Sequence, residues 1–314
     1  MELLRVSEHI RLLKLSTPQP YEAVNVYIVG EGDSLCLIDA GPAADECFRQ
    51  IEQALVEVGS SVGKLEAILL THSHVDHAGL AGRIQKLSGC RVYVHPRDVE
   101  GVVDPVGKAA ERFKGVVDEL VEPEVKGLVQ SALEVGARRL EAHFVNVEPT
   151  PLPLGSKLYG LQIIEAPGHT PGSSVYVSEV GLCGDTLLDT LTLLIEDLEA
   201  YFETLSRLGQ LGVSSLWPGH GGALHPANKW IEAIRQKYTG RVEAVRRIIR
   251  EPRTLYEATK LLYGGALVWD PTSVRGNLAF ALLQTKTYLG YLLEKRLAEK
   301  SIRGGRTYYK ACEP

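Results

Sequence analysis

Seven histidine and aspartate side chains occupy short loops whose spacing is typical of a metal-binding site. The first loop, residues 72–77, reads HSHVDH. Its histidines and aspartate stand at positions i, i+2, i+4 and i+5, which do not share one face of a helix. They therefore need a loop at the end of a strand, which can turn several side chains toward one point.

Three later segments carry the other candidates: His169 in the sequence PGHTPG, Asp185 in GDT directly after a predicted strand, and His220 in PGHGG. Glycine and proline hold such loops rigidly and let the backbone pass close to a metal. Neutral imidazole and carboxylate suit Zn(II), Mn(II) or Fe(II). The complete set provides enough ligands for two ions with open positions: His72, His74, Asp76, His77, His169, Asp185 and His220.

A lone histidine is more often a packed or surface residue than a ligand. Clustering reverses that preference for the five histidines of the loops. Four histidines lie outside these motifs, and we expect them to have structural roles: His9, His95, His143 and His225.

The segments between the loops predict a layered α/β fold. Strands are predicted over 25–29, 34–38, 67–70, 91–94, 161–165, 174–178, 181–183 and 215–217, the first two as a hairpin. Helices are predicted over 43–58, 78–87 and 198–208. Residues 97–145 are expected to be mostly helical and to form a wall or lid of the substrate pocket. Aromatic residues with a predicted core role, and a pocket role as the alternative, are Tyr176, Tyr201, Phe202 and Trp217.

Length and charge predict two domains. The chain has 314 residues, and domains average about 150 residues. Residues 1–225 carry 17 Lys and Arg against 31 Asp and Glu, a net charge of −14, whereas residues 226–314 carry 17 against 8, a net charge of +9. We therefore expect a catalytic domain over 1–225 and a basic domain over 226–314. Helices are predicted over 230–250, 254–263 and 277–300, and a hairpin over 301–310.

Composition excludes several classes of protein. Hydrophobic residues make up 45% and charged residues 23%, so the chain is not disordered or collagen-like. No apolar run approaches the roughly 20 residues of a membrane helix, and charged residues interrupt 1–15, unlike a signal peptide. We expect a cytoplasmic protein without a membrane partner. The five cysteines form no CxxC pair and are expected to be buried, inert thiols. Scarce Met and Asn favour a thermophilic source.

The four motifs, in this order, resemble the metallo-β-lactamase superfamily, whose signature is HxHxDH followed by a downstream His, Asp and His. The similarity covers residues of about 20–225. The segments GDTL and PGHG resemble the glyoxalase II-like and lactamase-beta-2-like branches. The basic tail is similar, less specifically, to the winged-helix C-terminal region of the latter branch.

The resemblance implies an αββα sandwich with a dinuclear site at one edge. It implies that His72, His74 and His169 hold one metal, that Asp76, His77 and His220 hold the second, and that Asp185 bridges them. Zinc is expected, with Fe or Mn as alternatives. Asp39 matches a family position behind the site, where it would orient a ligand imidazole. The alternative is a turn-capping acid.

Two divalent ions roughly 3.5–4 Å apart can hold a bridging water and lower its pKa toward about 7. The resulting hydroxide would attack a carbonyl carbon or a phosphorus, and Asp76 or Asp185 could take a proton. We expect a metal-dependent hydrolase of small-molecule esters, thioesters or lactones, promiscuous if its pocket accepts several of them.

Three alternatives stay open. The basic tail would suit a nuclease of the endoribonuclease-like phosphodiesterase type, but the chain lacks a long insertion between Asp185 and His220. A diiron protein that handles oxygen or peroxide would tend to carry Glu in place of His74, together with a flavin domain. A non-catalytic winged-helix protein would not need a complete ligand set. The last long helix has an apolar face made of Leu289, Leu292, Leu293 and Leu297, which favours a C-terminal region that packs against the catalytic domain. Nucleic acid would then be a secondary partner. The oligomeric state stays open.

Overall fold

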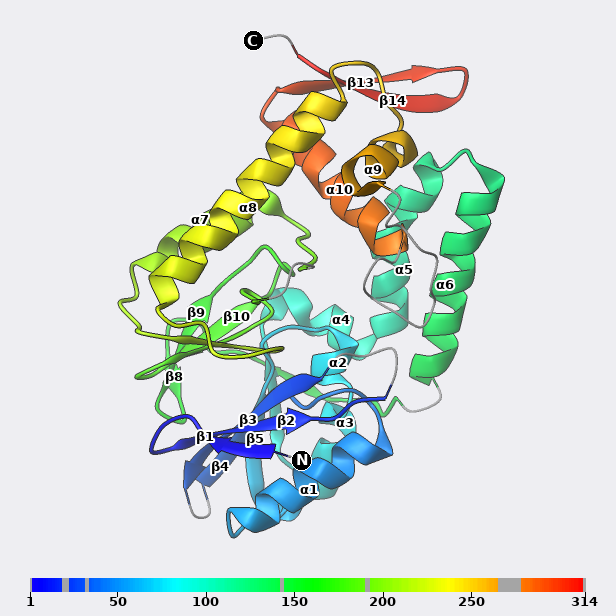
Figure 1. Cartoon of the computed structure of the whole chain (residues 1–314). Helices are drawn as coiled ribbons and strands as arrows, with labels where there is room; N and C mark the ends of the chain where they lie inside the picture. The colour runs from blue at the N-terminus through cyan, green and yellow to red at the C-terminus, as the bar shows by residue number, and fades with distance from the viewer. Residues whose placement is uncertain are drawn as a thin grey trace.

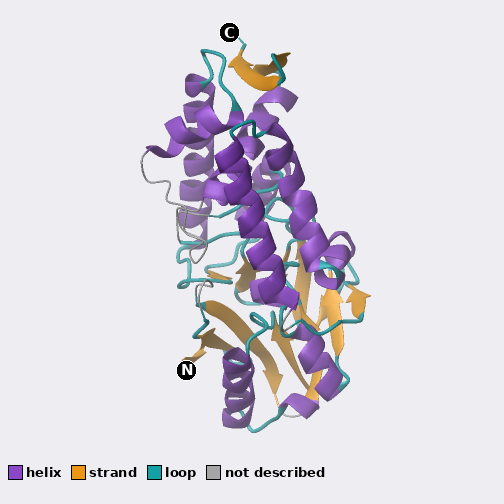
Figure 2. Ribbon diagram, turned by 90° about the vertical axis from the view of Figure 1, so that its right-hand side faces the viewer, coloured by secondary structure: helices purple, strands orange, loops and turns teal. Residues whose placement is uncertain are grey.

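A computed structural model describes residues 2–18, 23–31, 34–141, 144–189, 193–264 and 278–312. Two sheets lie at one end of the molecule, and a helical region with a C-terminal hairpin forms the other (Figures 1 and 2). The first sheet runs in the order β1 (Glu2–Arg5), β2 (Ile10–Leu15), β3 (Val24–Glu31), β4 (Ser34–Ile38), β5 (Leu65–Leu69), β6 (Arg91–Val94) and β7 (Pro149–Pro151). The second runs β12 (Leu216–Pro218), β11 (Gly181–Gly184), β10 (Ser174–Val177), β9 (Leu161–Glu165) and β8 (Lys157–Leu158).

The two sheets pack face to face. Alternate residues of β2 to β6 point inward and form one cluster with Leu161, Ile163, Tyr176 and Leu182 of the second sheet. The intervening residues point outward, as Leu13, Ile28 and Leu37 do, and form a separate cluster with the helices on that side. Because both faces are covered, these strands are apolar almost throughout.

Helices cover both outer faces, which confirms the predicted αββα sandwich. The first sheet is covered by α1 (Asp45–Glu57), α2 (Val75–Ala78), α3 (Ala81–Ser88) and α4 (Val99–Val103), with the short 3₁₀ turns η1 (Val62–Lys64) and η2 (Pro96–Asp98). The second sheet is covered by α7 (Leu198–Gly209) and α8 (Ala227–Ile248). None of the described helices is both long and apolar enough to cross a lipid bilayer.

The remaining elements complete the helical end of the molecule: α5 (Pro105–Glu119), α6 (Pro123–Glu141), α9 (Leu255–Tyr263), α10 (Leu278–Glu294), β13 (Ala298–Arg303) and β14 (Arg306–Ala311). One apolar cluster joins Val116 of α5, Tyr201 of α7, Tyr238 of α8, Leu282 of α10 and Tyr309 of β14. Residues on both sides of position 225 thus share a core. The division into two domains stays a prediction.

Two predicted helices differ from the structure, and several strands were not predicted. The predicted helix 78–87 is broken, because the Leu80 N–H bonds to the Gly41 carbonyl at 3.1 Å and separates α2 from α3. The predicted helix 277–300 ends at Glu294, because Arg296 has a φ of 56° and residues from Ala298 pair with β14; its first residue, Asn277, lies outside the described residues. Strands β1, β2, β7 and β8 were not predicted.

Glu119 at the end of α5 ties the helical hairpin α5–α6 to the C-terminal elements. Its carboxylate accepts hydrogen bonds from Lys286 of α10 at 2.7 Å, Lys300 of β13 at 3.0 Å and Tyr309 of β14 at 2.7 Å. The Glu119 side chain is only 9% exposed. Burial alone would raise its pKa, but these three donors hold the pKa of Glu119 below its usual value.

We expect Glu119→Gln to lower the free energy of unfolding by about 2 kcal/mol at pH 7, because the buried hydrogen-bonded charge is lost. A carboxyl with a lowered pKa stabilises the fold above its ordinary pKa of 4.5, and this contribution is lost as the pH falls. The difference from wild type in urea unfolding should therefore shrink on acidification. Glu111→Gln, on the exposed side of the same helix, is the control. A pH-independent difference would contradict this assignment.

Candidate metal centre

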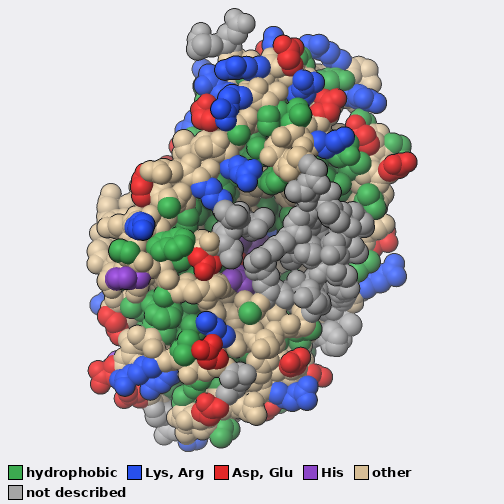
Figure 3. All heavy atoms as spheres, viewed as in Figure 1, with side chains coloured by type: hydrophobic (Ala, Val, Ile, Leu, Met, Phe, Trp, Pro, Cys, Tyr) green, Lys and Arg blue, Asp and Glu red, His purple; other side chains and the backbone are tan. Residues whose placement is uncertain are grey.

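The seven candidate ligands meet at one edge of the sandwich. The parallel pairs β4–β5 and β11–β12 end at this edge, so the loops that follow them converge. Residues 70–74 form a loop after β5, but Asp76 and His77 lie in the short helix α2 that follows it and not in the predicted loop. Asp185 follows β11, His220 follows β12, and His169 lies in the turn between β9 and β10. Histidine side chains are visible near the middle of this face in Figure 3.

The structure brings the candidates together in three overlapping groups. His72, His74 and His169 form the first, and Asp76, His77 and His220 form another. A third group, made of His72, His77 and Asp185, joins these two. Within each group the ligand atoms lie within 4.8 Å of one another. The first two groups are the two ligand sets that the resemblance implied, and the third contains Asp185, the aspartate that it implied to be shared.

Asp185 lies between the two halves of the cluster. Its carboxylate oxygens are 3.5 Å from His77 Nε2, 3.6 Å from His220 Nε2 and 3.9 Å from His169 Nε2. Asp76 Oδ2 lies 3.4 Å from His220 Nε2. These separations are longer than most hydrogen bonds.

Four histidines use Nδ1 to contact the protein, which leaves Nε2 facing the cluster. The Nδ1 atom of His77 lies 2.9 Å from Asp39 Oδ2, and that of His72 lies 2.9 Å from Thr71 Oγ1. Those of His169 and His220 donate to the carbonyls of Leu194 at 2.6 Å and Ala23 at 2.9 Å. A ring that donates through Nδ1 presents an Nε2 lone pair when it is neutral.

These lone pairs fit a bound cation. His77 Nε2 and His220 Nε2 are only 3.2 Å apart, a separation that requires a proton or a metal ion between the two nitrogens. In the described part of the chain, three buried atoms of the cluster have no hydrogen-bond partner: His72 Nε2, His74 Nε2 and Asp185 Oδ1. Buried polar atoms are rarely left unpaired, so the donor set fits a divalent metal.

Burial and charge divide the histidines into two types. Burial holds the pKa of His72 and of His74 well below the usual value, and it also lowers the pKa of His169. Burial acts in the same sense on His77 and His220, but the nearby Asp185 and Asp76 carboxylates raise their pKa to about 9 and about 10. The same carboxylates would favour a bound cation.

Asp39 fixes the first loop from behind. Its Oδ1 accepts the Thr71 N–H at 2.7 Å, and its Oδ2 accepts the Thr71 hydroxyl at 2.9 Å as well as His77 Nδ1–H. Because the single hydroxyl proton of Thr71 goes to Asp39, Thr71 Oγ1 accepts from His72 Nδ1–H. Asp39 therefore orients two imidazoles, which is the first of the two roles considered for it.

The comparison with known families agrees with this geometry. Residues 20–235 match the description "Metallo-beta-lactamase superfamily". The chain belongs to this superfamily.

Relatives within the metallo-beta-lactamase superfamily are distant in sequence. The chain is 26% identical to a probable metallo-hydrolase of Bacillus subtilis, with 98% of this chain and 99% of that protein covered. It is 28% identical to a hydroxyacylglutathione hydrolase of Cupriavidus taiwanensis over 56% of this chain and 53% of that protein. The fold is similar to a metallo-beta-lactamase family protein of Thermus thermophilus, with a TM-score of 0.81, 23% identity and coverage of 98% and 100%.

Asp98 also positions the loops of this superfamily member, and our sequence analysis missed it. Its side chain is buried and accepts hydrogen bonds from Ser73 N at 2.9 Å, Thr170 Oγ1 at 2.8 Å and Gly172 N at 2.7 Å. It thus joins loop 70–74 to loop 167–172. An available signal was its position just after β6, like the aspartates that follow β4 and β11.

The remaining histidines and the aromatic candidates lie outside the cluster. His95 accepts the Arg97 N–H and contacts Glu165, His9 pairs with Glu31, and His225 bonds to a backbone carbonyl; His143 lies outside the described residues. Tyr176 and Tyr201 are fully buried, and their hydroxyls donate to the carbonyls of Leu70 and Thr186. Phe202 and Trp217 are half-buried against the core. The predicted core role of these aromatics is confirmed.

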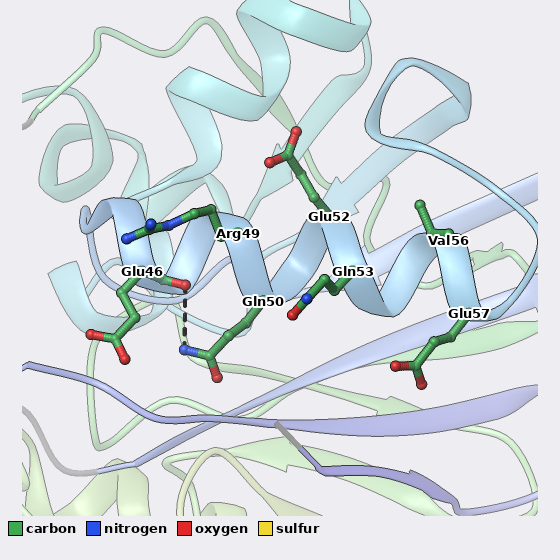
Figure 4. A pocket seen from close by; sticks show the side chains of 7 residues that line it. All are labelled: Glu46, Arg49, Gln50, Glu52, Gln53, Val56 and Glu57. Atoms are coloured by element: carbon green, nitrogen blue, oxygen red, sulfur yellow. Dashed lines mark hydrogen bonds between the residues drawn. The ribbon is translucent and has the colours of Figure 1, made fainter.

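A shallow groove on α1 is separate from the cluster. Figure 4 shows its lining side chains, which all come from this one helix and include Glu46, Glu52 and Glu57. No candidate ligand lines it. We assign it no part in the site.

We expect Asp98→Asn to lower the free energy of unfolding by about 3 kcal/mol, because an amide N–H₂ would face donors that now bond to a buried carboxylate. Urea unfolding measures this loss. Asp104→Asn is the matched control: Asp104 also accepts a backbone N–H, that of Gly107 at 2.9 Å, but on the surface, where Asn caps about as well as Asp. Equal stability of the two variants would contradict the role of Asp98.

Proposed function

We propose that this superfamily member is a dinuclear metal-dependent hydrolase of small-molecule esters, thioesters or lactones. In this proposal His72, His74 and His169 hold one divalent ion, and Asp76, His77 and His220 hold a second. Asp185 is shared between them. Zinc is the proposed metal, with iron and manganese as alternatives.

One observation carries the proposal: two groups of three ligands lie side by side, joined by one buried carboxylate, and three of their atoms are buried without a hydrogen-bond partner among the described residues. When bound, such a pair of ions would supply Lewis acidity and activate water near neutral pH. No serine or cysteine nucleophile is needed. Cys183, just before the site, is buried in the core, and burial raises the pKa of its thiol.

The protein's own residues have separate roles in this proposal. In this proposal either Asp76 or Asp185 would accept the proton that the attacking water releases. Asp39 keeps the rings of His72 and His77 turned toward the reacting centre. Helices α5 and α6 form a wall of the pocket, which is the proposed role of the region 97–145.

The small-molecule substrate class rests on two supports. One is the similarity to a relative named hydroxyacylglutathione hydrolase, which favours an acylated thiol over the other candidates. The other is the acidic body of residues 1–225, with its net charge of −14 (17 Lys and Arg against 31 Asp and Glu), which repels polyanions.

The cytoplasmic location and the thermophilic source stay predictions.

The proposal predicts two metal ions per chain after purification without chelator, measured by elemental analysis. Asp185→Asn and His72→Ala should keep the fold but lower the hydrolysis of a thioester substrate by at least about 100-fold, because loss of a residue that only supports a metal ligand already costs about 10–100-fold and both residues are proposed as direct ligands. Circular dichroism checks the fold.

His9→Ala is the matched control, since this exposed histidine pairs with Glu31 and lies outside the ligand cluster. It should retain the wild-type metal content and rate. A metal content near zero, without gain of activity on addition of Zn, Mn or Fe, would overturn the proposal. So would wild-type rates in both ligand variants.

A nuclease is the second candidate, and the basic C-terminal region is the observation that favours it. The order α8, α9, α10, β13 and β14 supports the proposal of a winged-helix-like region. Basic side chains gather at this end of the molecule (Figure 3). Those exposed on the hairpin and near the end of α8 are Arg247, Arg250, Lys300, Arg303, Arg306 and Lys310.

Titration with RNA across a range of salt concentrations decides between the two candidates. The nuclease predicts tight binding that weakens steeply with salt and cleavage that requires the metal. Arg303→Glu with Arg306→Glu should then weaken binding more than Arg49→Glu on α1 at the opposite end. We expect no binding at low salt, which would leave the small-molecule hydrolase.

A further inference from the structure

The short segment 193–197, here called the junction segment, contacts three separate parts of the molecule. Toward the second sheet, the N–H groups of Glu196 and Asp197 bond to the Gly168 carbonyl at 2.8 and 3.1 Å. Toward α5, Glu196 forms an ion pair of 2.6 Å with Arg112. The segment therefore lies between the His169 loop and the helical end of the molecule.

Two C-terminal helices hold the backbone of the junction segment. On α10, Gln284 Oε1 accepts the Ile195 N–H at 2.9 Å, and Thr287 Oγ1 donates to the Ile195 carbonyl at 2.9 Å. On α8, the Tyr238 hydroxyl donates to the Leu193 carbonyl at 2.9 Å. The carbonyls on either side of Leu194 are thereby fixed by side chains from residues beyond position 225.

The Leu194 carbonyl is the only partner found for His169 Nδ1 among the described residues, at 2.6 Å. This bond sets which nitrogen of His169 carries the proton and how the ring is turned. A shift of the junction segment would therefore rotate the ring and move Nε2 relative to His74 Nδ1, which lies 3.0 Å away.

We propose that Gln284 and Thr287 of α10 are positioning residues for the metal ligand His169, acting through the junction segment and the Leu194 carbonyl. This inference rests on the proposed dinuclear site. It gives the C-terminal helices a role in building the metal centre, because they hold the segment that orients His169, a proposed ligand of one of the two ions. Among the described residues, the ligands of the other ion make no hydrogen bond to this segment: His220 bonds to Ala23 and His77 to Asp39.

The chemistry of Gln284 supports a positioning role. The side chain is 7% exposed, and its Nε2 is buried without a hydrogen-bond partner in the described chain. Burying an unpaired amide N–H₂ costs free energy, about 1–3 kcal/mol. A leucine would fill this place in an apolar cluster without that cost, so the amide is best explained by the bond that its oxygen makes to Ile195.

Helix α10 also offers a matched control. Thr285 is buried, and its hydroxyl donates to Ala281 O at 2.8 Å within the same helix; among the described residues it makes no hydrogen bond to the junction segment. Thr287 makes a similar, longer bond to Leu283 O at 3.3 Å in addition to its bond to Ile195. Threonine to valine at the two positions therefore makes the same chemical change but breaks the contact to the junction segment only at 287.

The experiment titrates the full-length apoprotein with Zn²⁺ in competition with a chromophoric chelator, which resolves the two binding events. We expect Thr287→Val and Gln284→Leu each to lower the affinity for one of the two zinc ions by about tenfold and to leave the affinity for the other unchanged. Tenfold is the low end of what the loss of a residue that supports a metal ligand costs. Thr285→Val should match wild type, and Thr287→Ser, which retains the hydroxyl, should restore the affinity.

Unchanged affinities in Thr287→Val and Gln284→Leu would overturn the inference. An equal loss at both ions, shared by Thr285→Val, would also overturn it, because this would show a general loss of stability. If the wild-type chain itself binds no zinc, iron or manganese, the proposed function fails, and this inference falls with it. The affinities of the wild-type chain thus separate the two failures.

Discussion

The carboxylate of Asp39 holds together two histidines that belong to different halves of the cluster. It contacts His77 directly and His72 through the Thr71 hydroxyl. Asp39 has a φ of 62°, a backbone conformation that few residues other than glycine adopt. The conformation is tolerated because buried hydrogen bonds from Thr71, just after β5, and from His77 of α2 hold the carboxylate behind the two rings.

Close packing around Asp39 extends to glycines of the second sheet. A Cβ at Gly184 would clash with the Thr71 hydroxyl, and a Cβ at Gly219 would clash with Asp185 and His77. Tyr27 and Asn25 of β3 hold the loop after β12 by donating to the Pro218 carbonyl at 2.6 and 2.8 Å. The two sheets thus meet at the cluster with no room for larger side chains at these two positions.

The C-terminal region is integrated with the rest of the molecule by several kinds of contact. Apolar residues of α8 and α10 belong to the same cluster as those of α5 and α7. Glu119 joins α5 to three donors beyond position 225, and Lys295 pairs with Glu199 of α7 at 2.7 Å. Some acidic residues of the segment 1–225 therefore form ion pairs with basic residues of the segment 226–314, and other charged residues of both segments are exposed to solvent.

The sequence by itself determined the ligand types, their order and most of the strands. Ligand spacing in residues 72–77 and the turns around His169, Asp185 and His220 are local features, and local patterns can be read from neighbours in the chain. The resemblance built on those motifs also implied the sandwich and the membership of the two ligand groups, which the structure brings together.

Only the tertiary structure decided what lies behind the ligands and where several elements end. Asp98, Leu194, Gln284 and Thr287 are separated from their partners by long stretches of chain, and the interruption between α2 and α3 depends on a bond to Gly41. The periodicity of a segment does not show which distant residue will become its hydrogen-bond partner in the folded chain. The orientation of a buried imidazole is set by such partners, because each buried polar atom must find one in three dimensions.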